Sequence, residues 1–485
     1  MNIDKVGEIF RGNPKFAKRP HNESDHKYRD KFERDRDRIL YSKEFRRLNR
    51  KTQVFVSGFD DHVRNRLTHT IEVAQISQTI ANRLGLNEQL TEAIAYGHDV
   101  GHTPFGHVGE RLLNNFMNGC LKIGDHYEVL ETEKGFKHNW QSVRVVTELE
   151  NISNKYSGLN LTDYTIWGML NHTKIQPKKC DFQNDRICNF RNREEECICI
   201  DDKKFSFDFY TKYAKYFNSE TSWTIEGLIV RMSDEIAQRH HDLEDGIYAK
   251  IIDRNEIINK LKSLFESHFT QIEIDKLDEL KEINNQSILL HDLSSLIINF
   301  LVTKVIENTK INLEKIVSNY SLTNSESFNK EKSKIFNQED VFNIVTFSDD
   351  LRINEGKFQK FLKNRVLNSH LAQSMDGKAT YMLRKIIEAY MTNPQQLPDN
   401  TIGLFYKRYY FKTYEKYDTS IHSYSGKIGN LRNCLNDDHK NLSNIEYRTN
   451  LMRTITDFIA GMTDDFAIKQ FNKLYSGENI FIANY

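Results

Sequence analysis

The chain has 485 residues with 68 basic and 68 acidic side chains, so its formal charge of zero gives no global argument for binding to nucleic acid or membranes. Its apolar share of 38% and charged share of 28% are typical of a folded globular protein and exclude a disordered one. Glycine (22) and proline (6) are scarce, which favours helices. We therefore predict an all-α protein that is long enough for two or three domains.

The N-terminal residues predict two helical segments joined by a short link. Residues 27–50 read as a basic helix, with eleven Lys/Arg against five Asp/Glu between positions 27 and 51. Salt bridges on a solvated helix account for most such charges, and an anion-binding segment is the alternative. Residues 64–84 carry an apolar stripe with helical spacing, and Gly85 is placed to end that helix.

The remainder of the chain is also predicted to be helical. A helix from residue 88 to about residue 99 is stopped by Gly101 and Pro104, and a new helix begins near Gly106. Further helical regions and one loop are expected in this order: 224–242, 255–332 and the loop 392–400.

We divide the chain into three parts. Residues 1–53 form an N-terminal helical segment, 54–250 a core, and 251–485 a C-terminal helical region. Within the core, residues 174–204 are charged and weakly periodic, so they read as an insertion. The first ten residues lack the apolar stretch of a signal peptide, and no apolar run approaches a membrane span. We therefore expect a cytoplasmic protein with no membrane partner.

One short stretch concentrates titratable side chains. The sequence YGHDVGHTPFGHVGE, residues 96–110, holds three histidines, an aspartate and a glutamate among four glycines and a proline. His98 and His102 have the i, i+4 spacing of a zinc protease helix, but that motif needs a glutamate between them as general base, on an unbroken helix. Here Asp99 takes that position, and glycine and proline break the helix. The pattern therefore disfavours a protease.

The alternative is a metal site completed by other helices. Asp234 lies on an otherwise apolar helix, where an unpaired acid is costly to bury. The proposed ligands are two imidazoles and two carboxylates: His69, His98, Asp99 and Asp234. This mixed nitrogen and oxygen set suits Mn or Fe, and Mg less well, and leaves positions for water and a phosphate oxygen. Each residue alone would read as structural, whereas their order and intervals are specific.

With these four residues the sequence resembles the HD-domain deoxynucleoside triphosphate triphosphohydrolases, the dGTPase-like branch of the HD superfamily. The resemblance extends over matching stretches from about residue 34 to residue 467. These stretches are RDRDRILYSKEFRRLNRKTQVF, RNRLTHTIEVAQI, GHDVGHTPFGHVGE, FKHNWQSVRVV, DEIAQRHHDLEDG, MDGKATYMLRKIIEAYMTNPQQLP and TDFIAGMTDDFA. The family implies an HD-domain helical core in 54–250, and a C-terminal region that completes the nucleotide pocket and the oligomer contacts.

The resemblance also implies an activity and a role for individual residues. The family hydrolyses a dNTP, here dGTP by expectation, to a deoxynucleoside and inorganic triphosphate, with a divalent ion such as Mn, Mg, Fe or Co. His107 is similar to the catalytic histidine, and Glu110, one helical turn later, would orient it. His102 would contact the α-phosphate, and Arg66 would clamp phosphate. Further substrate contacts are expected from Gln53 at the sugar, from His138 and Asn139 in the pocket, and from Asp242 at the 3′-hydroxyl.

One position departs from the family pattern. Many members have a tyrosine four residues after the last metal aspartate, packed against the sugar, and this chain has Gln238 there. Discrimination against ribonucleotides is therefore open. Two other functions stay open as well: an HD-type phosphodiesterase or nucleotidase, and a nucleotide-sensing or nucleic-acid-binding scaffold. The resemblance further implies a homo-oligomer, a nucleotide effector at a second site and binding of single-stranded nucleic acid.

Four cysteines fall in the insertion, with the spacing Cys180-x7-Cys188-x8-Cys197-x-Cys199. They could bind a structural zinc ion, with His172 able to replace one ligand. Four-cysteine sites usually use pairs separated by two to four residues, which this spacing does not provide. The alternative is four free thiols on a surface insertion.

Overall fold

The computed structural model describes residues 3–53, 64–121, 123, 128–173, 207–410, 432, 435 and 442–476. These residues form helices and loops, and no β-strand occurs among them. The β-type pairing within these ranges consists of two isolated bridges, Thr52–Asn65 and Asn151–Gly158. The predicted all-α fold is confirmed.

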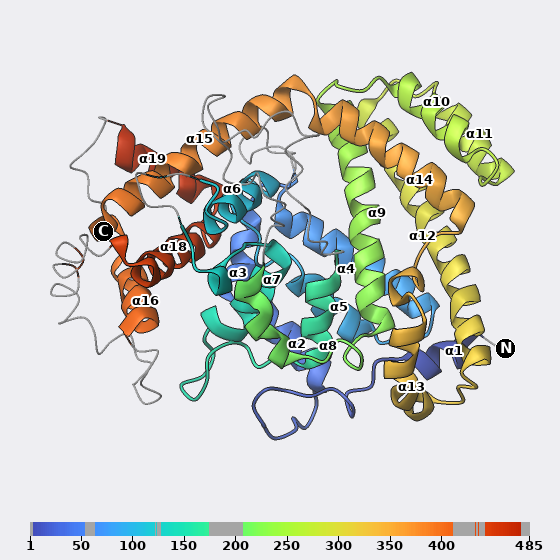
Figure 1. Cartoon of the computed structure of the whole chain (residues 1–485). Helices are drawn as coiled ribbons and strands as arrows, with labels where there is room; N and C mark the ends of the chain where they lie inside the picture. Colours follow the sequence, from blue (N-terminus) through green and yellow to red (C-terminus); the bar gives the residue numbers. More distant parts are fainter. Residues whose placement is uncertain are drawn as a thin grey trace.

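The helices follow one another as Figure 1 labels them. The first half of the chain contains α1 (Ile3–Phe10), α2 (Lys31–Leu40), α3 (Lys43–Arg47), α4 (Arg66–Arg83), α5 (Glu88–Gly97), α6 (His107–Met117), α7 (His138–Arg144), α8 (Asp163–Asn171) and α9 (Ile225–Tyr248). The second half contains α10 (Arg254–Phe265), α11 (Gln271–Glu279), α12 (Gln286–Asn319), α13 (Ser325–Gln338), α14 (Asp349–Leu362), α15 (His370–Thr392), α16 (Asp399–Tyr410), α18 (Ile445–Ala460) and α19 (Asp464–Tyr475).

Local signals explain where the helices begin and end. The basic segment expected as one helix is two, because Ser42 caps a new helix and accepts a hydrogen bond from the N–H of Phe45. Asn65 caps α4 by accepting from the N–H of Thr68. Gly85 follows α4 with φ of 70°, a conformation that suits glycine, so the predicted end of this helix is confirmed.

The largest core surrounds α9, the long helix that stands near the centre of Figure 1. Helices α4, α5 and α8 pack against it on one side and α12 on another. The same core includes buried side chains from α10, α12, α13 and α14, such as Leu261, Phe300 and Phe358. It therefore crosses the boundary expected near residue 250, because α9 presents apolar faces both to the preceding helices and to the following ones.

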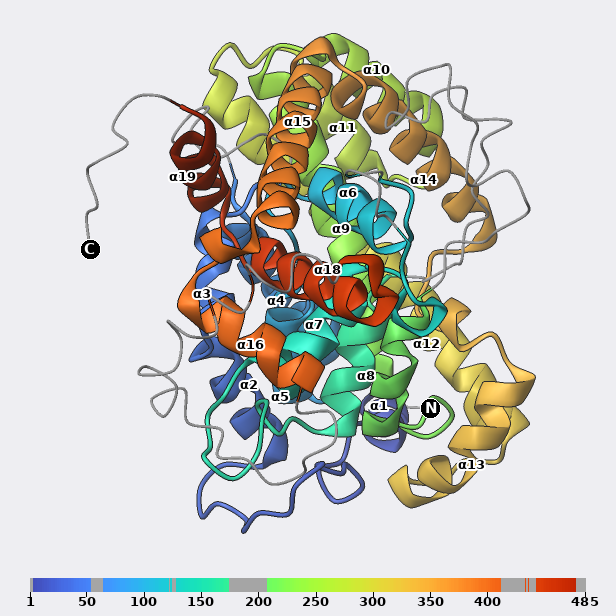
Figure 2. The same ribbon diagram turned by 60° about the vertical axis from the view of Figure 1, so that its left-hand side comes forward.

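A second core lies at the other end of the molecule. It joins α6 to α15, α16, α18 and α19 through buried side chains that include Leu112, Leu383 and Ile455. Figure 2 shows α18 and α16 crossing in front of α7, with α15 and α19 above them. The C-terminal helices therefore cover the segment that follows the histidine-rich stretch.

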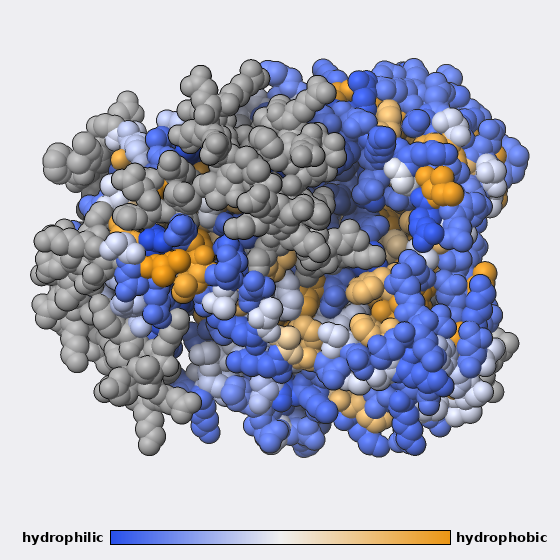
Figure 3. All heavy atoms as spheres, viewed as in Figure 1, coloured by the Kyte–Doolittle hydropathy of each residue, from blue (hydrophilic) through white to orange (hydrophobic). Residues whose placement is uncertain are grey.

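Helix α12 is the exception to the expectation that no segment could span a membrane. Its 34 residues are long and apolar enough by length and composition, and half of its most apolar window is buried. Its apolar side chains pack in the core, among them Leu293, Ile297 and Leu301. On the face shown in Figure 3, hydrophilic residues cover most of the described surface, and apolar residues form separate groups. Packing against α9 and the other core helices thus accounts for the buried half of this window.

Candidate metal centre

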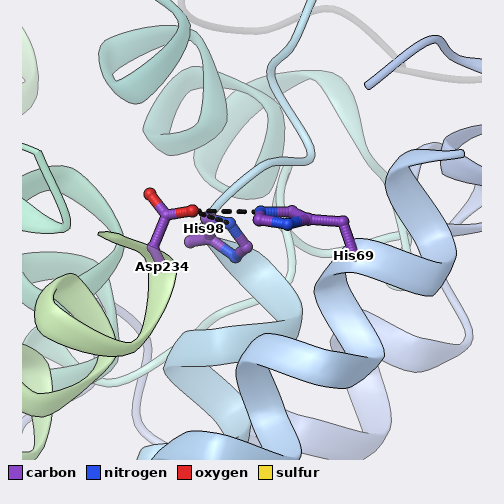
Figure 4. A group of neighbouring side chains, drawn as sticks. All are labelled: His69, His98 and Asp234. Atoms are coloured by element: carbon purple, nitrogen blue, oxygen red, sulfur yellow. Dashed lines mark ion pairs between the residues drawn. The ribbon is translucent and has the colours of Figure 1, made fainter. Parts of the chain in front are cut away.

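Three helices bring two histidines and an aspartate together. His69 lies on α4, His98 directly follows α5, and Asp234 lies on α9 (Figure 4). The Nε2 atom of His69 is 3.0 Å from Oδ1 of Asp234, and Nε2 of His98 is 4.0 Å from the same oxygen. One ligand atom from each residue lies within 4.8 Å of the others. The residues predicted on separate helices are therefore close enough to share one metal ion.

The hydrogen bonds of His98 fit a metal ligand. Its Nδ1 donates to the backbone oxygen of Ala95 over 2.6 Å, which leaves a lone pair on Nε2. The side chain is fully buried, and this Nε2 has no hydrogen-bond partner among the described residues. A buried acceptor without a donor costs free energy unless a cation fills the gap. The donor set therefore fits a divalent ion.

Asp99, the fourth predicted ligand, lies at the edge of this group. Its Oδ1 is 3.6 Å from Nε2 of His98 and 3.3 Å from Nε2 of His102, and its Oδ2 accepts from Arg66 over 2.6 Å. Burial opposes ionisation of Asp99, but His102, His98 and Arg66 together hold the pKa of its carboxyl well below the usual value. Arg66, predicted to clamp phosphate, thus also keeps a proposed ligand ionised.

The other histidines gather on the far side of Asp99. The ring of His102 stacks on that of His138 with centroids 3.9 Å apart, and His107 lies 5.5 Å from His102 and 6.0 Å from His138. The Nε2 of His172 is 3.3 Å from Nε2 of His138 and 4.0 Å from Oδ1 of Asp99. The structure therefore brings all three predicted histidines together and adds His172, which was considered only as a zinc ligand.

Glu110 hydrogen-bonds to His138 and Lys137, whereas His107 was its expected partner. Its carboxylate accepts from Nδ1 and the backbone N–H of His138, and from Nζ of Lys137 over 2.6 Å. His107 lies near this pair, with one ring nitrogen within 4.8 Å of a Glu110 oxygen and a His138 nitrogen. The hydrogen-bonded pair is therefore Glu110 and His138, with His107 beside it.

The protein surroundings keep His102 and His107 neutral. Burial, strengthened by the charge of Arg66, lowers the pKa of His102 well below its ordinary value. The side chain of His107 is exposed to solvent, and the protein atoms around its ring remove part of its hydration. That desolvation, opposed by Glu110, lowers the pKa of His107 to about 4. A neutral His107 can accept a proton at physiological pH.

A tight turn separates the metal donors from His107. Phe105 and Gly106 have φ of 56° and 57°, and such a conformation is rare for a residue with a side chain. The backbone N–H of Phe105 donates to Oδ1 of Asp464 over 2.8 Å, and Thr52 donates its N–H to the other oxygen over 2.7 Å. The buried Nζ of Lys51 donates to the backbone oxygens of His102 and Ala460. The C-terminal region therefore holds the turn.

The other predicted substrate-binding residues differ in burial and in hydrogen bonding. Gln53 follows Thr52, and its Oε1 is buried without a partner among the described residues. Asn139, beside His138, is buried and donates to Leu170 and Thr173. Gln238 is half-buried on α9, one turn after Asp234. Asp242, one turn further, is buried, and this burial raises the pKa of its carboxyl to about 7.

Two sequence features have different outcomes. The basic segment 27–51 forms many ion pairs, as expected for a salt-bridged surface. They join Arg29 and Arg36 to Asp37, Arg34 and Arg38 to Glu23, and Arg47 to Glu44. Cys180, Cys188, Cys197 and Cys199 lie outside the described residues, so the zinc hypothesis stays a prediction. His172, by contrast, belongs to the histidine cluster around Asp99.

Sequence reasoning missed several residues of this centre. Lys137 and Asp464 lie in motifs that were recognised, but no spacing rule links them to Glu110 or to the turn. The separations along the chain explain this, since Asp464 contacts residues 359 and 412 positions away. His172 had a weak signal as a histidine after the apolar helix α8.

Comparisons with known proteins agree with this geometry. The chain matches the HD domain over residues 66–207 and the phosphohydrolase-associated domain over residues 345–407 and 430–473. It is 32% identical over 455 residues to a deoxyguanosinetriphosphate triphosphohydrolase-like protein of Rickettsia rickettsii (strain Iowa), covering 93% of this chain and 92% of the relative. A protein of the same description from Rickettsia typhi is 33% identical, with 92% of each chain covered. The chain is thus a metal-dependent phosphohydrolase, and it belongs to the family of HD-domain deoxyguanosinetriphosphate triphosphohydrolase-like proteins.

Proposed function

We propose that this protein hydrolyses a dNTP, with dGTP as the expected substrate, to a deoxynucleoside and inorganic triphosphate. In this reaction the oxygen of a water molecule bonds to the α-phosphorus, and the bond from that phosphorus to the 5′-oxygen breaks. A proton passes from the water to the 5′-oxygen, so the nucleoside leaves as an alcohol and the three phosphates leave together.

The observation that carries this proposal is the proximity of two sets of side chains. The donors His69, His98, Asp99 and Asp234 form one set, and Asp99 joins it to a second set that contains His102, His107, His138 and Glu110. A phosphodiesterase needs the first set, but the second set provides histidine nitrogens and a carboxylate beside it. Such a pairing of a metal centre with a separate acid–base group suits attack on phosphorus.

The metal donors have a defined role in this proposal. His69, His98, Asp99 and Asp234 would hold a divalent ion, which when bound withdraws charge from a phosphate oxygen and lowers the pKa of water. Arg66 donates to Asp99 through one guanidinium nitrogen, so its two other nitrogens do not take part in this contact. Of these two, Nε has no partner among the described residues. That geometry leaves it able to donate to a phosphate oxygen while it still pairs with Asp99.

The protonation state of His107 supports its role as the general base. A general base must be unprotonated at the working pH, and a pKa of about 4 keeps His107 in that state. Glu110 lies within reach to stabilise the imidazolium that forms when His107 accepts a proton. Neutral His102, stacked on His138, would donate to an α-phosphate oxygen.

The sugar contacts remain as the resemblance places them. Gln53 would meet the sugar, Asp242 the 3′-hydroxyl, and His138 and Asn139 the pocket wall. Gln238, where many relatives have tyrosine, would leave the 2′ position less tightly packed. We also propose that the protein acts in the cytoplasm as a homo-oligomer, that a nucleotide activates it, and that binding of single-stranded nucleic acid is a side activity.

A product assay tests the proposed reaction. The purified chain is incubated with each of the four dNTPs and with GTP, in the presence of Mn²⁺ or Mg²⁺, and the products are separated by ion exchange. Tripolyphosphate and deoxyguanosine from dGTP are the expected products. Pyrophosphate or orthophosphate as the sole inorganic product would refute the proposal. Comparable turnover of GTP and dGTP would show that Gln238 relaxes discrimination against ribose.

A further inference from the structure

A group of charged side chains lies directly behind the metal donors on α4 and α9. Glu72 is one turn after His69 on α4, and His241 lies two turns after Asp234 on α9. Nδ1 of His69 is 3.3 Å from Nδ1 of His241, and Nε2 of His241 hydrogen-bonds with Oε2 of Glu72. A continuous path of hydrogen bonds thus leads from His69 to Glu72, and both histidines are buried.

The chemistry of the groups fixes the direction of this path. An ionised carboxylate only accepts hydrogen bonds, so Nε2 of His241 must donate to Glu72. A neutral imidazole carries one proton, which leaves Nδ1 of His241 as an acceptor. Nδ1 of His69 must then donate to it. With a metal ion bound by His69 and Asp234, Nε2 of His69 need not donate to the Asp234 carboxylate 3.0 Å away, so the ring proton would be held on Nδ1 and a lone pair would remain on Nε2 for the metal.

We propose that His241 and Glu72 are positioning residues that fix the tautomer and the orientation of His69, so that its Nε2 can bind the metal ion. This inference rests on the metal site of the proposed function and adds the groups behind it. Metal-binding histidines usually donate their other nitrogen to a carboxylate or a carbonyl oxygen. His98 follows that rule through Ala95, whereas His69 reaches its carboxylate through a second histidine.

The same residues could in principle hold a second cation, since Glu72, His240 and His241 have ligand atoms within 4.8 Å of one another. The guanidinium of Arg64 opposes this assignment. Its Nε donates to Glu72 over 3.2 Å, and its NH2 forms an ion pair with Glu244. Arg64 thus places a fixed positive charge on the other carboxylate oxygen of Glu72 from the one that His240 and His241 contact, and this charge disfavours a further cation at the same carboxylate. The geometry therefore favours a role for Glu72 and His241 in positioning His69 over a second cation site.

The chain offers a matched control for this proposal. His240 is the neighbour of His241, is equally buried, and places its Nε2 3.0 Å from the same Glu72 oxygen. No hydrogen bond joins His240 to His69 in the described structure. His240→Gln therefore disturbs Glu72 and the core to a similar degree but leaves the acceptor of His69 in place.

Four variants of the full chain test the proposal: His241→Phe, His241→Asn, Glu72→Gln and His240→Gln. Mn²⁺ alone is titrated by calorimetry into each protein after chelator treatment, and circular dichroism confirms that the protein is folded. His241→Phe should weaken Mn²⁺ binding about 10- to 100-fold, the usual effect of losing such a partner. His241→Asn offers an amide oxygen to Nδ1 of His69, so it should recover most of that loss. His240→Gln should bind Mn²⁺ within about threefold of the wild type.

The outcomes separate this inference from the proposed reaction. Wild-type affinity in folded His241→Phe would overturn the positioning role, as would equal losses in His241→Phe and His240→Gln. If His241→Phe does not fold, Glu72→Gln decides, because it keeps the size of the side chain but removes the charge. Unchanged Mn²⁺ affinity in Glu72→Gln would then refute the proposal. A wild-type protein that binds Mn²⁺ but releases no tripolyphosphate would refute the reaction and leave the role of His241 intact.

Discussion

Replacing Asp464 by alanine should loosen the turn that separates the metal donors from His107. The carboxylate of Asp464 is fully buried at the start of α19 and accepts hydrogen bonds from the N–H of Phe105 and from the N–H and hydroxyl of Thr52. Phe105 and Gly106 both have positive φ, so the turn depends on contacts outside itself to keep its shape.

The magnitude follows from these contacts. A hydrogen bond to a charged group contributes about 1.5–3 kcal/mol, so losing the two from backbone N–H groups alone should cost about 3–6 kcal/mol. Asp464→Asn keeps one carbonyl oxygen and should lose about half as much. Because His102 and His107 flank the turn, a displacement on the order of 1 Å should lower kcat about 100-fold.

The assay compares Asp464→Ala with Asp465→Ala. Asp465 is the next residue of α19, is partly exposed, and contacts only Arg50 at 3.9 Å among the described ion pairs. Urea midpoints give the loss of stability, and tripolyphosphate release at a temperature where both variants are folded gives kcat. Asp465→Ala should stay close to the wild type in both measurements.

Two results would refute this reasoning. A folded Asp464→Ala protein with wild-type kcat would show that the turn keeps its shape without the carboxylate. Equal effects in Asp464→Ala and Asp465→Ala would show that α19 acts through general stability and not through the hydrogen bond to Phe105.

Three further predictions concern the metal centre, the base and a buried lysine. His98→Ala and Asp99→Ala should lose bound Mn²⁺ and turnover together, as measured by metal analysis and product release. In the wild type, Mn²⁺ affinity should decrease as the pH is lowered through about 6.5, because the histidine ligands become protonated. His107→Ala should lose turnover but keep its metal, and near-normal rates would exclude His107 as the base. Burial lowers the pKa of Lys332 to about 7, against about 10.4 in an unfolded chain. Between pH 7 and pH 10 the unfolded state therefore binds more protons than the folded state, so the free energy of unfolding should rise over this range. Lys332→Met should be more stable at pH 7 and should flatten that rise, which urea midpoints at both pH values will check.

The sequence predicted the helices and the residues near the metal better than the contacts between them. The apolar stripe of α4 and the glycine after it are local signals, so their prediction was confirmed. The four proposed ligands could be named because their types and order are specific; the structure groups His69, His98 and Asp234, and Asp99 lies beside His98, while their role as ligands stays a prediction. The pairing of Glu110 with His138 was missed, since 28 residues separate them and helical spacing pointed to His107. The core around α9 also crosses the expected boundary, because periodicity shows that a face is apolar but not which helix covers it.

The contact between Asp464 and Phe105 has a consequence for the order of folding. Residues 359 positions apart must meet before the histidine turn reaches its final shape, and such distant contacts form late because the closed loop costs entropy. Helix α19 must therefore be synthesised and docked before the centre is complete. During refolding, recovery of helical signal should precede recovery of activity, and chains that have formed only the HD-domain helices should lack turnover. Docking of the far C-terminal helix is thus expected to be a late step in the maturation of a site formed mostly by the first half of the chain.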